Sequence, residues 1–335
     1  MSDQVYELGD VALQSGLTLS GARIAYRTYG KLNAAKSNAI LFPTWYAAQH
    51  PDLEWVIGPQ WALDPGRWFI VTVDILGNGA SSSPSNQPRP FDRSRFPRVS
   101  ILDNVMLQRR LLVEKLGVGK LALVVGRSMG AQLAFQWGAY YPDMVERILP
   151  LAGSARTSPH NYAFLQIVKM SLTADPSFRG GEYAELPLPA LRNMRLVFDT
   201  WGLSQTWYRQ GLFSKLGPFR TKEEFLDREL APPLRDPNDL LAQVATWERA
   251  DISDNDRFRK DFPAALKAIR AKAIVMPSRT DCYFPPEDSE IEVAGMPNAE
   301  LRVVPSVWGH RAAAPGTDPE DIRFFDRAIR DLLAA

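Results

Sequence analysis

The sequence predicts an α/β fold in which a mainly parallel central sheet carries helices on both faces and one helical insertion interrupts the pattern. Three observations lead to this prediction. Short apolar runs rich in β-branched residues recur along the 335-residue chain, helical patterns lie between several of them, and one long segment lacks such runs. Alternation of strands and helices is typical of parallel sheets, because a helix is the usual connection between parallel neighbours.

The predicted strands are short runs that are apolar almost throughout. A strand with one wet face alternates apolar and polar residues, so continuous apolar runs indicate strands that are covered on both faces. A sixth run, at 300–304, is a weaker candidate. The other five are AILF at 39–42, WFIVTV at 68–73, LALVV at 121–125, ILPL at 148–151 and AIVM at 273–276.

Helical spacing of apolar residues is found in the segments between and after these runs. In 101–116 and in 319–333, apolar residues recur three or four positions apart, as on the buried face of a helix. The stretch AQLAFQWGAYYP at 131–142 is a further helix candidate, directly after the strand at 121–125. We expect the helices to cover both faces of the sheet.

The alternation stops between about residues 154 and 256. This segment has no convincing buried strand, but it has helical periods, many aromatic residues and turn signals such as Arg179-Gly180-Gly181. A separate second domain is possible, but alternation resumes at Ala273, which favours an insertion between two strands of one sheet. We therefore predict a core of residues 1–154 and 257–335 and a helical insertion of residues 155–256.

Composition and charge exclude several classes of protein. The chain has 39 basic and 38 acidic residues, so its net charge of +1 gives no electrostatic reason to expect nucleic-acid or anionic-membrane partners. Its one cysteine, Cys282, excludes an internal disulfide and a cysteine metal cluster. The first ten residues lack the basic and apolar regions of a secretory signal, and no run reaches 18 apolar residues. The expectation is a cytoplasmic, soluble protein without a membrane-spanning helix.

A candidate nucleophile lies at the corner between the strand at 121–125 and the helix that follows. Gly126-Arg127-Ser128-Met129-Gly130 fits the pattern G-x-S-x-G, in which glycines relieve crowding at a tight turn and the serine hydroxyl projects above the sheet edge. The pattern alone arises by chance in roughly one chain in ten of this length. A turn that uses its glycines only for packing is the alternative, so the assignment depends on partners elsewhere in the chain.

Histidine is the usual base that activates a serine hydroxyl, and the chain has three. His310 follows the weak sixth strand and precedes the last helix, after the serine in the chain. His50 and His160 lie before or just after the serine, so they fit the known order Ser, Asp or Glu, His less well. We therefore predict His310 as the base.

A carboxylate between serine and histidine in the chain completes such a triad. Asp281 lies just past the strand at 273–276, where a side chain can reach across the sheet edge and orient His310. Asp288 is a weaker candidate, because Pro285-Pro286 indicates that it begins the next helix. We predict Asp281 as the third member.

Acyl transfer also needs two N–H groups that stabilise the oxyanion. One should be the backbone N–H of Met129, directly after the serine. The other should come from the loop after an early strand, most simply at Trp45. The neighbouring Tyr46 is a candidate for the wall of the substrate pocket or for the core. The chemistry needs no metal and no cofactor, and none is predicted.

With these residues identified, the chain resembles the α/β-hydrolase superfamily and, more narrowly, its homoserine O-acetyltransferase-like family. The resemblance runs nearly end to end. It implies an α/β-hydrolase fold, Ser128 as nucleophile with Asp281 and His310 as partners, a helical lid formed by the insertion, and a homodimer. The motifs that carry it are AYRTYGKLNAAKSNAILFPT, ALDPGRWFIVTVDILGNGASSSPSN, GRSMGAQLAFQWGAYYPDMVERI, TDCYFPPE and GH.

The chain departs from this family where the transferases hold their amino-acid acceptor. An acidic residue that faces the substrate amino group normally follows the catalytic histidine, and here that position is Arg311. Arg195 matches the family's lid arginine for the substrate carboxylate, but Gly202 stands where a tyrosine is expected seven residues later. The serine motif reads GRSMGA instead of GGSMGG. These departures favour family members that hydrolyse esters.

The preferred hypothesis is thus a serine esterase acting on small acyl esters, most simply acetyl esters, with Tyr46, Arg195 and Arg311 as candidate substrate contacts. The alternative is an O-acyltransferase that uses acyl-CoA and an amino-acid or alcohol acceptor, since the acyl-enzyme on Ser128 would be the same. A non-catalytic binding protein is a third hypothesis, and the complete set of triad residues argues against it.

Overall fold

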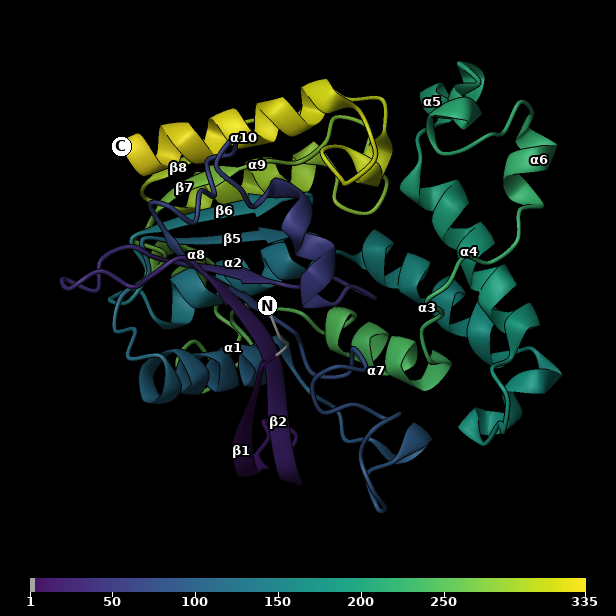
Figure 1. The fold of residues 1–335 in the computed structure, drawn as a ribbon, viewed down its shortest axis with the longest axis horizontal. Helices are drawn as coiled ribbons and strands as arrows, with labels where there is room; N and C mark the ends of the chain where they lie inside the picture. Colours follow the sequence, from purple (N-terminus) through teal and green to yellow (C-terminus); the bar gives the residue numbers. More distant parts are fainter. Residues whose placement is uncertain (1–3) are drawn as a thin grey trace.

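An eight-stranded sheet runs through the centre of the computed structural model, which describes residues 4–335 (Figure 1). The strand order is β1-β2-β4-β3-β5-β6-β7-β8, and every pair from β4 to β8 is parallel. The predicted mainly parallel sheet is therefore confirmed. The strands are β1 (Gln4–Ala12), β2 (Thr18–Tyr29), β3 (Ala39–Pro43), β4 (Phe69–Val73), β5 (Leu123–Arg127), β6 (Arg147–Leu151), β7 (Lys272–Val275) and β8 (Ala299–Leu301).

The apolar runs predict the strands from β3 to β8, and the continuous burial that marks these runs is complete in the central ones. Every residue of β3, β4 and β5 is buried, because helices cover both faces there. The first two strands were not predicted. They form an antiparallel hairpin at one edge, and β2 joins the parallel strands by pairing antiparallel with β4. Most residues of β1 are exposed, so it lacks the continuous apolar run that marked the others.

The two faces of the sheet carry different helices. Val105 of α1, Phe135 of α2 and Leu266 of α8 pack in one apolar cluster, while Phe325 and Ile329 of α10 pack in the cluster on the opposite face. This confirms the prediction of helices on both faces. The helices of the core are α1 (Ile101–Arg110), which continues as a π-helical turn at Leu111–Lys115, α2 (Met129–Tyr140), α8 (Phe262–Lys267), α9 (Pro286–Gly295) and α10 (Pro319–Ala334).

The insertion between β6 and β7 contains helices and short 3₁₀ turns, and it lies to one side of the sheet in Figure 1. Where the chain enters and leaves it, the two segments pair: the Thr157 N–H donates to the Ala250 carbonyl (2.8 Å) and the Ile252 N–H to the Ala155 carbonyl (3.1 Å). Its helices are α3 (Pro159–Thr173), α4 (Leu188–Gly202), α5 (Gln205–Arg209), α6 (Lys222–Leu226) and α7 (Pro237–Trp247).

Aromatic side chains join the insertion to the core. Phe164 of α3 stacks on Tyr283 with ring centroids 4.5 Å apart, and Trp247 of α7 stacks on Phe284 at 5.6 Å. Tyr283 and Phe284 lie two and three residues after Asp281, so the insertion packs beside the segment that carries this candidate site residue. Among the helices of residues 4–335, none has both the length and the apolar character that crossing a membrane requires.

Candidate active site

Ser128 occupies the corner between β5 and α2 in a strained backbone conformation. Its φ and ψ are 54° and −122°, a left-handed region that side-chain-bearing residues rarely adopt. The flanking glycines make this turn possible. A Cβ on Gly126 would lie 2.0 Å from the Gly130 carbonyl oxygen, and a Cβ on Gly130 would lie 2.8 Å from the Pro43 carbonyl oxygen. The glycines of the motif are therefore required by close backbone approach.

The three residues that the chain order singled out lie in contact. His310 Nε2 is 2.9 Å from Ser128 Oγ, and His310 Nδ1 is 2.8 Å from Asp281 Oδ2. A carboxylate only accepts hydrogen bonds, so Nδ1 carries the proton and Nε2 is the free acceptor that faces the serine hydroxyl. The second carboxylate oxygen, Asp281 Oδ1, accepts the N–H groups of Tyr283 (2.9 Å) and Phe284 (3.2 Å), which fixes its orientation.

The environment of His310 favours its neutral form. Burial lowers the pKa of the imidazole below its ordinary value of 6.5, and the nearby cations Arg127 and Arg311 lower it further, while Asp281 opposes them. The ring is thus a free base near neutral pH, which is the state that can take a proton from Ser128.

Arg127, the first variable residue of the serine motif, contacts two other segments of the site. Its side chain is buried, and burial lowers its pKa to about 10. It donates to the His310 carbonyl and its guanidinium lies 5.6 Å from the centre of the Trp45 ring. One side chain therefore links the serine turn, the histidine loop and the loop after β3.

The two residues predicted to supply the oxyanion donors both lie near Ser128: Met129 directly follows it in the chain, and Trp45 lines the same cavity. Met129 is the first residue of α2, and the first-turn N–H groups of a helix have no carbonyl partner within the helix. Trp45 lies just after β3, in a loop that lines the cavity beside the serine. The role of these two N–H groups remains a prediction.

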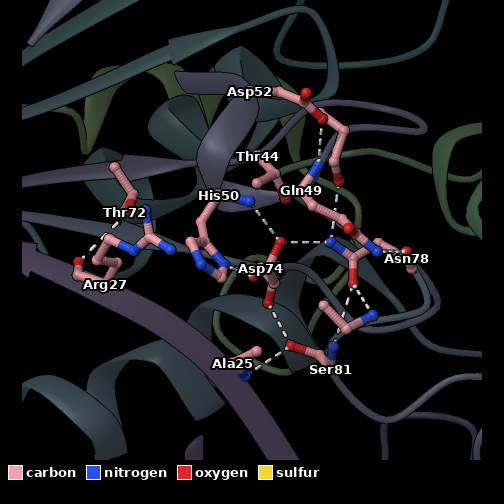
Figure 2. A network of polar contacts seen from close by, with 12 residues as sticks. Ala25, Arg27, Thr44, Gln49, His50, Asp52, Thr72, Asp74, Asn78 and Ser81 are labelled. Atoms are coloured by element: carbon pink, nitrogen blue, oxygen red, sulfur yellow. Dashed lines mark hydrogen bonds and ion pairs between the residues drawn. The ribbon is translucent and has the colours of Figure 1, made fainter. Parts of the chain in front are cut away.

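A polar network connects the loop after β3, which carries Trp45, to the segment after β4 (Figure 2). Asp74 Oδ2 is 2.5 Å from His50 Nδ1, and Asp74 Oδ1 accepts the His50 N–H (2.9 Å) and the Asn78 side-chain amide (2.6 Å). The same amide donates to the Ala48 carbonyl at 2.9 Å. The N–H of Ala47 donates to Gln243 at 2.9 Å. The loop is thus fixed from β4 and from α7.

The other two histidines lie away from Ser128, in agreement with their poor fit to the chain order. His50 is buried in the network described above. His160 is exposed on α3, with its ring 5.3 Å from that of Trp201. No group of three or more His, Cys, Asp or Glu side chains within residues 4–335 is arranged to hold a metal ion.

A cavity of about 430 Å³ opens at the serine and the histidine. Its wall contains mostly apolar side chains together with several charged ones. The three candidate substrate contacts, Tyr46, Arg195 and Arg311, all line it, so each lies within reach of a bound molecule. The other lining residues are Trp45, Ala47, Arg127, Met194, Phe198, Asp199, Trp247, Tyr283, Ala314, Pro315 and Thr317.

Asp199 is a residue of this wall that the sequence reasoning missed. It is buried on α4 and forms ion pairs with Arg195 (3.0 Å) and Arg228 (2.8 Å). Its spacing from Arg195, four residues along one helix, is a signal that could have indicated the first pair. Arg228 follows α6, 29 residues after Asp199 in the chain, and that pairing has no such signal.

The comparisons with known proteins agree with the fold. The α/β hydrolase fold family matches residues 40–312. The ethyl acetate hydrolase of Pseudomonas veronii is 37% identical over 339 residues, which cover 99% of this chain and 95% of that protein. The solved structure of an acetylester hydrolase from Corynebacterium glutamicum matches with a TM-score of 0.93 and 34% identity, covering 100% of this chain and 96% of the other.

Transferases are found among the more distant relatives. A homoserine O-acetyltransferase of Geobacter sulfurreducens is 29% identical over 364 residues, covering 97% of this chain and 95% of that protein. The similarity to esterases is thus the higher of the two.

Proposed function

Since the chain belongs to the α/β-hydrolase family, we propose that it is a serine esterase that hydrolyses small acyl esters, acetyl esters foremost. One observation carries the proposal. The contact from Asp281 through His310 to Ser128 ends at a cavity with a largely apolar wall. The similarity to an ethyl acetate hydrolase and an acetylester hydrolase supports the choice of substrate class.

The proposed reaction begins at the serine hydroxyl. His310 Nε2 takes the proton from Ser128 Oγ while the oxygen attacks the ester carbonyl, and the carbonyl π electrons move onto its oxygen. The backbone N–H groups of Met129 and Trp45 stabilise that oxyanion. When the carbonyl re-forms, the alcohol leaves with the proton from His310, and the acyl group stays on Ser128.

Water then repeats the sequence against the acyl-enzyme. His310 takes a proton from water, the hydroxide adds to the acyl carbon, and Ser128 leaves with the proton returned to it. Asp281 holds the ring in the tautomer that both steps need and stabilises the imidazolium in each. The mechanism uses only groups of this chain and one water molecule.

Water is the proposed acceptor because the cavity lacks an obvious site for an amine. An ammonium group is bound by carboxylates, but Arg311 stands directly after His310 at the cavity wall. Asp199, the carboxylate that lines the cavity, is already paired with arginines. This arrangement favours hydrolysis over transfer to an amino acid.

Two assays test the proposal. The protein is incubated with p-nitrophenyl acetate in water, and separately with acetyl-CoA plus homoserine or serine. We expect fast release of p-nitrophenol and no O-acetyl amino acid. CoA release that depends on the amino acid would contradict the esterase and favour the transferase. Ser128→Ala is the control and should abolish either activity without unfolding the protein.

The proposal extends to a cytoplasmic homodimer. A single cysteine suits a reducing compartment. Several large apolar side chains are exposed on the outer helices of the insertion, and surfaces of this kind are typical of subunit contacts. Cell fractionation and light scattering of the purified protein test the two statements. The exposed side chains are Tyr162, Ile167 and Met170 on α3, and Leu188 and Leu196 on α4.

A further inference from the structure

Asp199 is a buried carboxylate in the wall of the cavity, and the proposed reaction does not use it. Its side chain is 1% exposed, and it lines the cavity together with Arg195 and Arg311. Burying a carboxylate costs free energy unless cations and hydrogen bonds compensate it. Its contacts therefore show which groups of the wall are already engaged.

Arginines engage both of its oxygens. Arg195 Nη1 donates to Oδ2 at 3.0 Å, and Arg228 Nη2 donates to Oδ1 at 2.8 Å. Arg311 Nη2 lies 3.8 Å from the same Oδ1. The planar guanidinium is the side chain best suited to bind a carboxylate. Asp199 thus occupies the position at these arginines that a carboxylate in the cavity would otherwise take.

A second nitrogen of each of the two nearest arginines also donates to the protein. Arg195 Nη2 donates to the Leu226 carbonyl at 2.8 Å. Arg228 Nη1 donates to the Phe225 carbonyl at 2.6 Å, and its guanidinium lies 4.1 Å from the centre of the Phe225 ring. Arg195 borders the cavity, whereas Arg228 is not among the lining residues. Asp199 therefore holds one arginine that lines the cavity, Arg195, and one that does not, Arg228.

From this arrangement we infer that Asp199 is a specificity-determining residue that excludes carboxylate-bearing esters from the cavity. The inference rests on the proposed esterase function. A substrate carboxylate near Asp199 meets a like charge and finds Arg195 already paired, and both effects discriminate against it. An uncharged ester meets neither effect, and it packs against apolar residues of the wall such as Tyr46, Met194 and Phe198.

Asp199→Asn tests the inference, because it removes the charge and keeps the shape. Two matched substrate pairs locate the effect. Monoethyl succinate against ethyl pentanoate puts a carboxylate on the acyl side, and acetoxyacetate against propyl acetate puts it on the alcohol side. We expect the ratio of kcat/KM for the charged and the neutral ester to rise about tenfold or more in at least one pair, since one charge-assisted hydrogen bond has about this effect.

Arg228→Gln is the matched control. It also removes a partner of Asp199, but it leaves the carboxylate and Arg195 paired, so the ratio should stay at its native value. If Asp199→Asn does not fold, Asp199→Asn with Arg228→Gln loses one charge of each sign and carries the same expectation. A folded variant that keeps the native ratio for both pairs would overturn the inference.

A binding measurement separates this inference from the proposed function. In the Ser128→Ala background, calorimetry compares pentanoate with pentanamide, with and without Asp199→Asn. We expect the additional substitution to tighten binding of pentanoate at least about tenfold relative to the amide. This readout needs no turnover. Tightening without any ester hydrolysis by the native protein would reject the esterase and keep the role of Asp199, whereas hydrolysis without tightening would do the reverse.

Discussion

Residues 4–335 contain two buried pairs of histidine and aspartate, and one of these pairs faces the cavity. In both, a carboxylate oxygen lies within hydrogen-bond distance of Nδ1: 2.8 Å for His310 and Asp281, and 2.5 Å for His50 and Asp74. Both carboxylates also accept further N–H groups. The two pairs thus have nearly the same local hydrogen-bond geometry.

The difference lies in what surrounds each ring. His310 Nε2 is 2.9 Å from Ser128 Oγ, on a loop that lines the cavity. His50 directly follows the loop after β3. Its carboxylate partner, Asp74, lies at the end of β4 and also accepts a hydrogen bond from Asn78 (Figure 2). A histidine–aspartate pair therefore indicates a catalytic base only where a nucleophile and space for a substrate meet its second nitrogen.

The largest effect should come from removing the contact between His310 and Ser128, which brings a nucleophile to the first pair. Ser128→Ala or His310→Ala should lower kcat by about 10⁶-fold, since nucleophile and base act as a unit. Steady-state kinetics on p-nitrophenyl acetate measure this. The double variant should be no worse than either single one, and additive losses would contradict a shared role.

Asp281→Asn should lower kcat by about 10⁴-fold, because the amide allows the wrong tautomer of His310. The melting temperature should change little, since the side chain keeps its shape. A loss of less than tenfold would mean that Asp281 does not orient the base.

The equivalent change in the second pair, Asp74→Asn, should act on stability instead. It removes the negative charge of a buried carboxylate that accepts three hydrogen bonds, and it puts an NH₂ donor in place of one of the two acceptor oxygens. We expect the free energy of unfolding to fall by about 3 to 5 kcal/mol. Urea denaturation measures it. The kcat of the folded fraction should stay within about tenfold of the native value, because the residue reaches the site only through the Trp45 loop. A larger fall in kcat at native stability would show that this pair takes part in the reaction.

The smallest effect concerns pH. Because burial and two arginines lower the pKa of His310, kcat/KM should be constant around neutral pH and should reach this plateau at a lower pH than an ordinary imidazole would allow. It should fall in acid, where the ring gains a proton and no longer accepts one. Arg311→Gln removes one of the cations, so the acidic limb should move to higher pH. An acidic limb that moves to lower pH, or that does not move, would contradict this electrostatic account.

The central strands could be predicted because burial on both faces leaves a continuous apolar run, as in β3 and β5. The edge hairpin could not. In β1 most residues are exposed, and its pairing with β2 is decided by backbone hydrogen bonds that any side chain permits.

The residues proposed for the reaction follow from chain order, because G-x-S-x-G, Asp281 and His310 each lie at the end of a predicted strand. The second pair could not be predicted. His50 and Asp74 are 24 residues apart, and nothing in the sequence indicates that the loop with His50 lies against the end of the strand before Asp74. The wall of the cavity was predicted in part: Arg195 was named, but the ion pair that engages it depends on how α4 packs.

The paired ends of the insertion have a consequence for folding and for evolution. β6 and β7 are neighbours in the sheet although the whole insertion separates them in the chain. Because Ala155 pairs with Ile252, and Thr157 with Ala250, the intervening residues leave the core and return at one point. Doubling the length of such a loop costs only about 0.6 kcal/mol of closure free energy. The segment that shapes the cavity can therefore lengthen or shorten at little cost in closure free energy, provided that the stacking of Phe164 on Tyr283 and of Trp247 on Phe284 is kept.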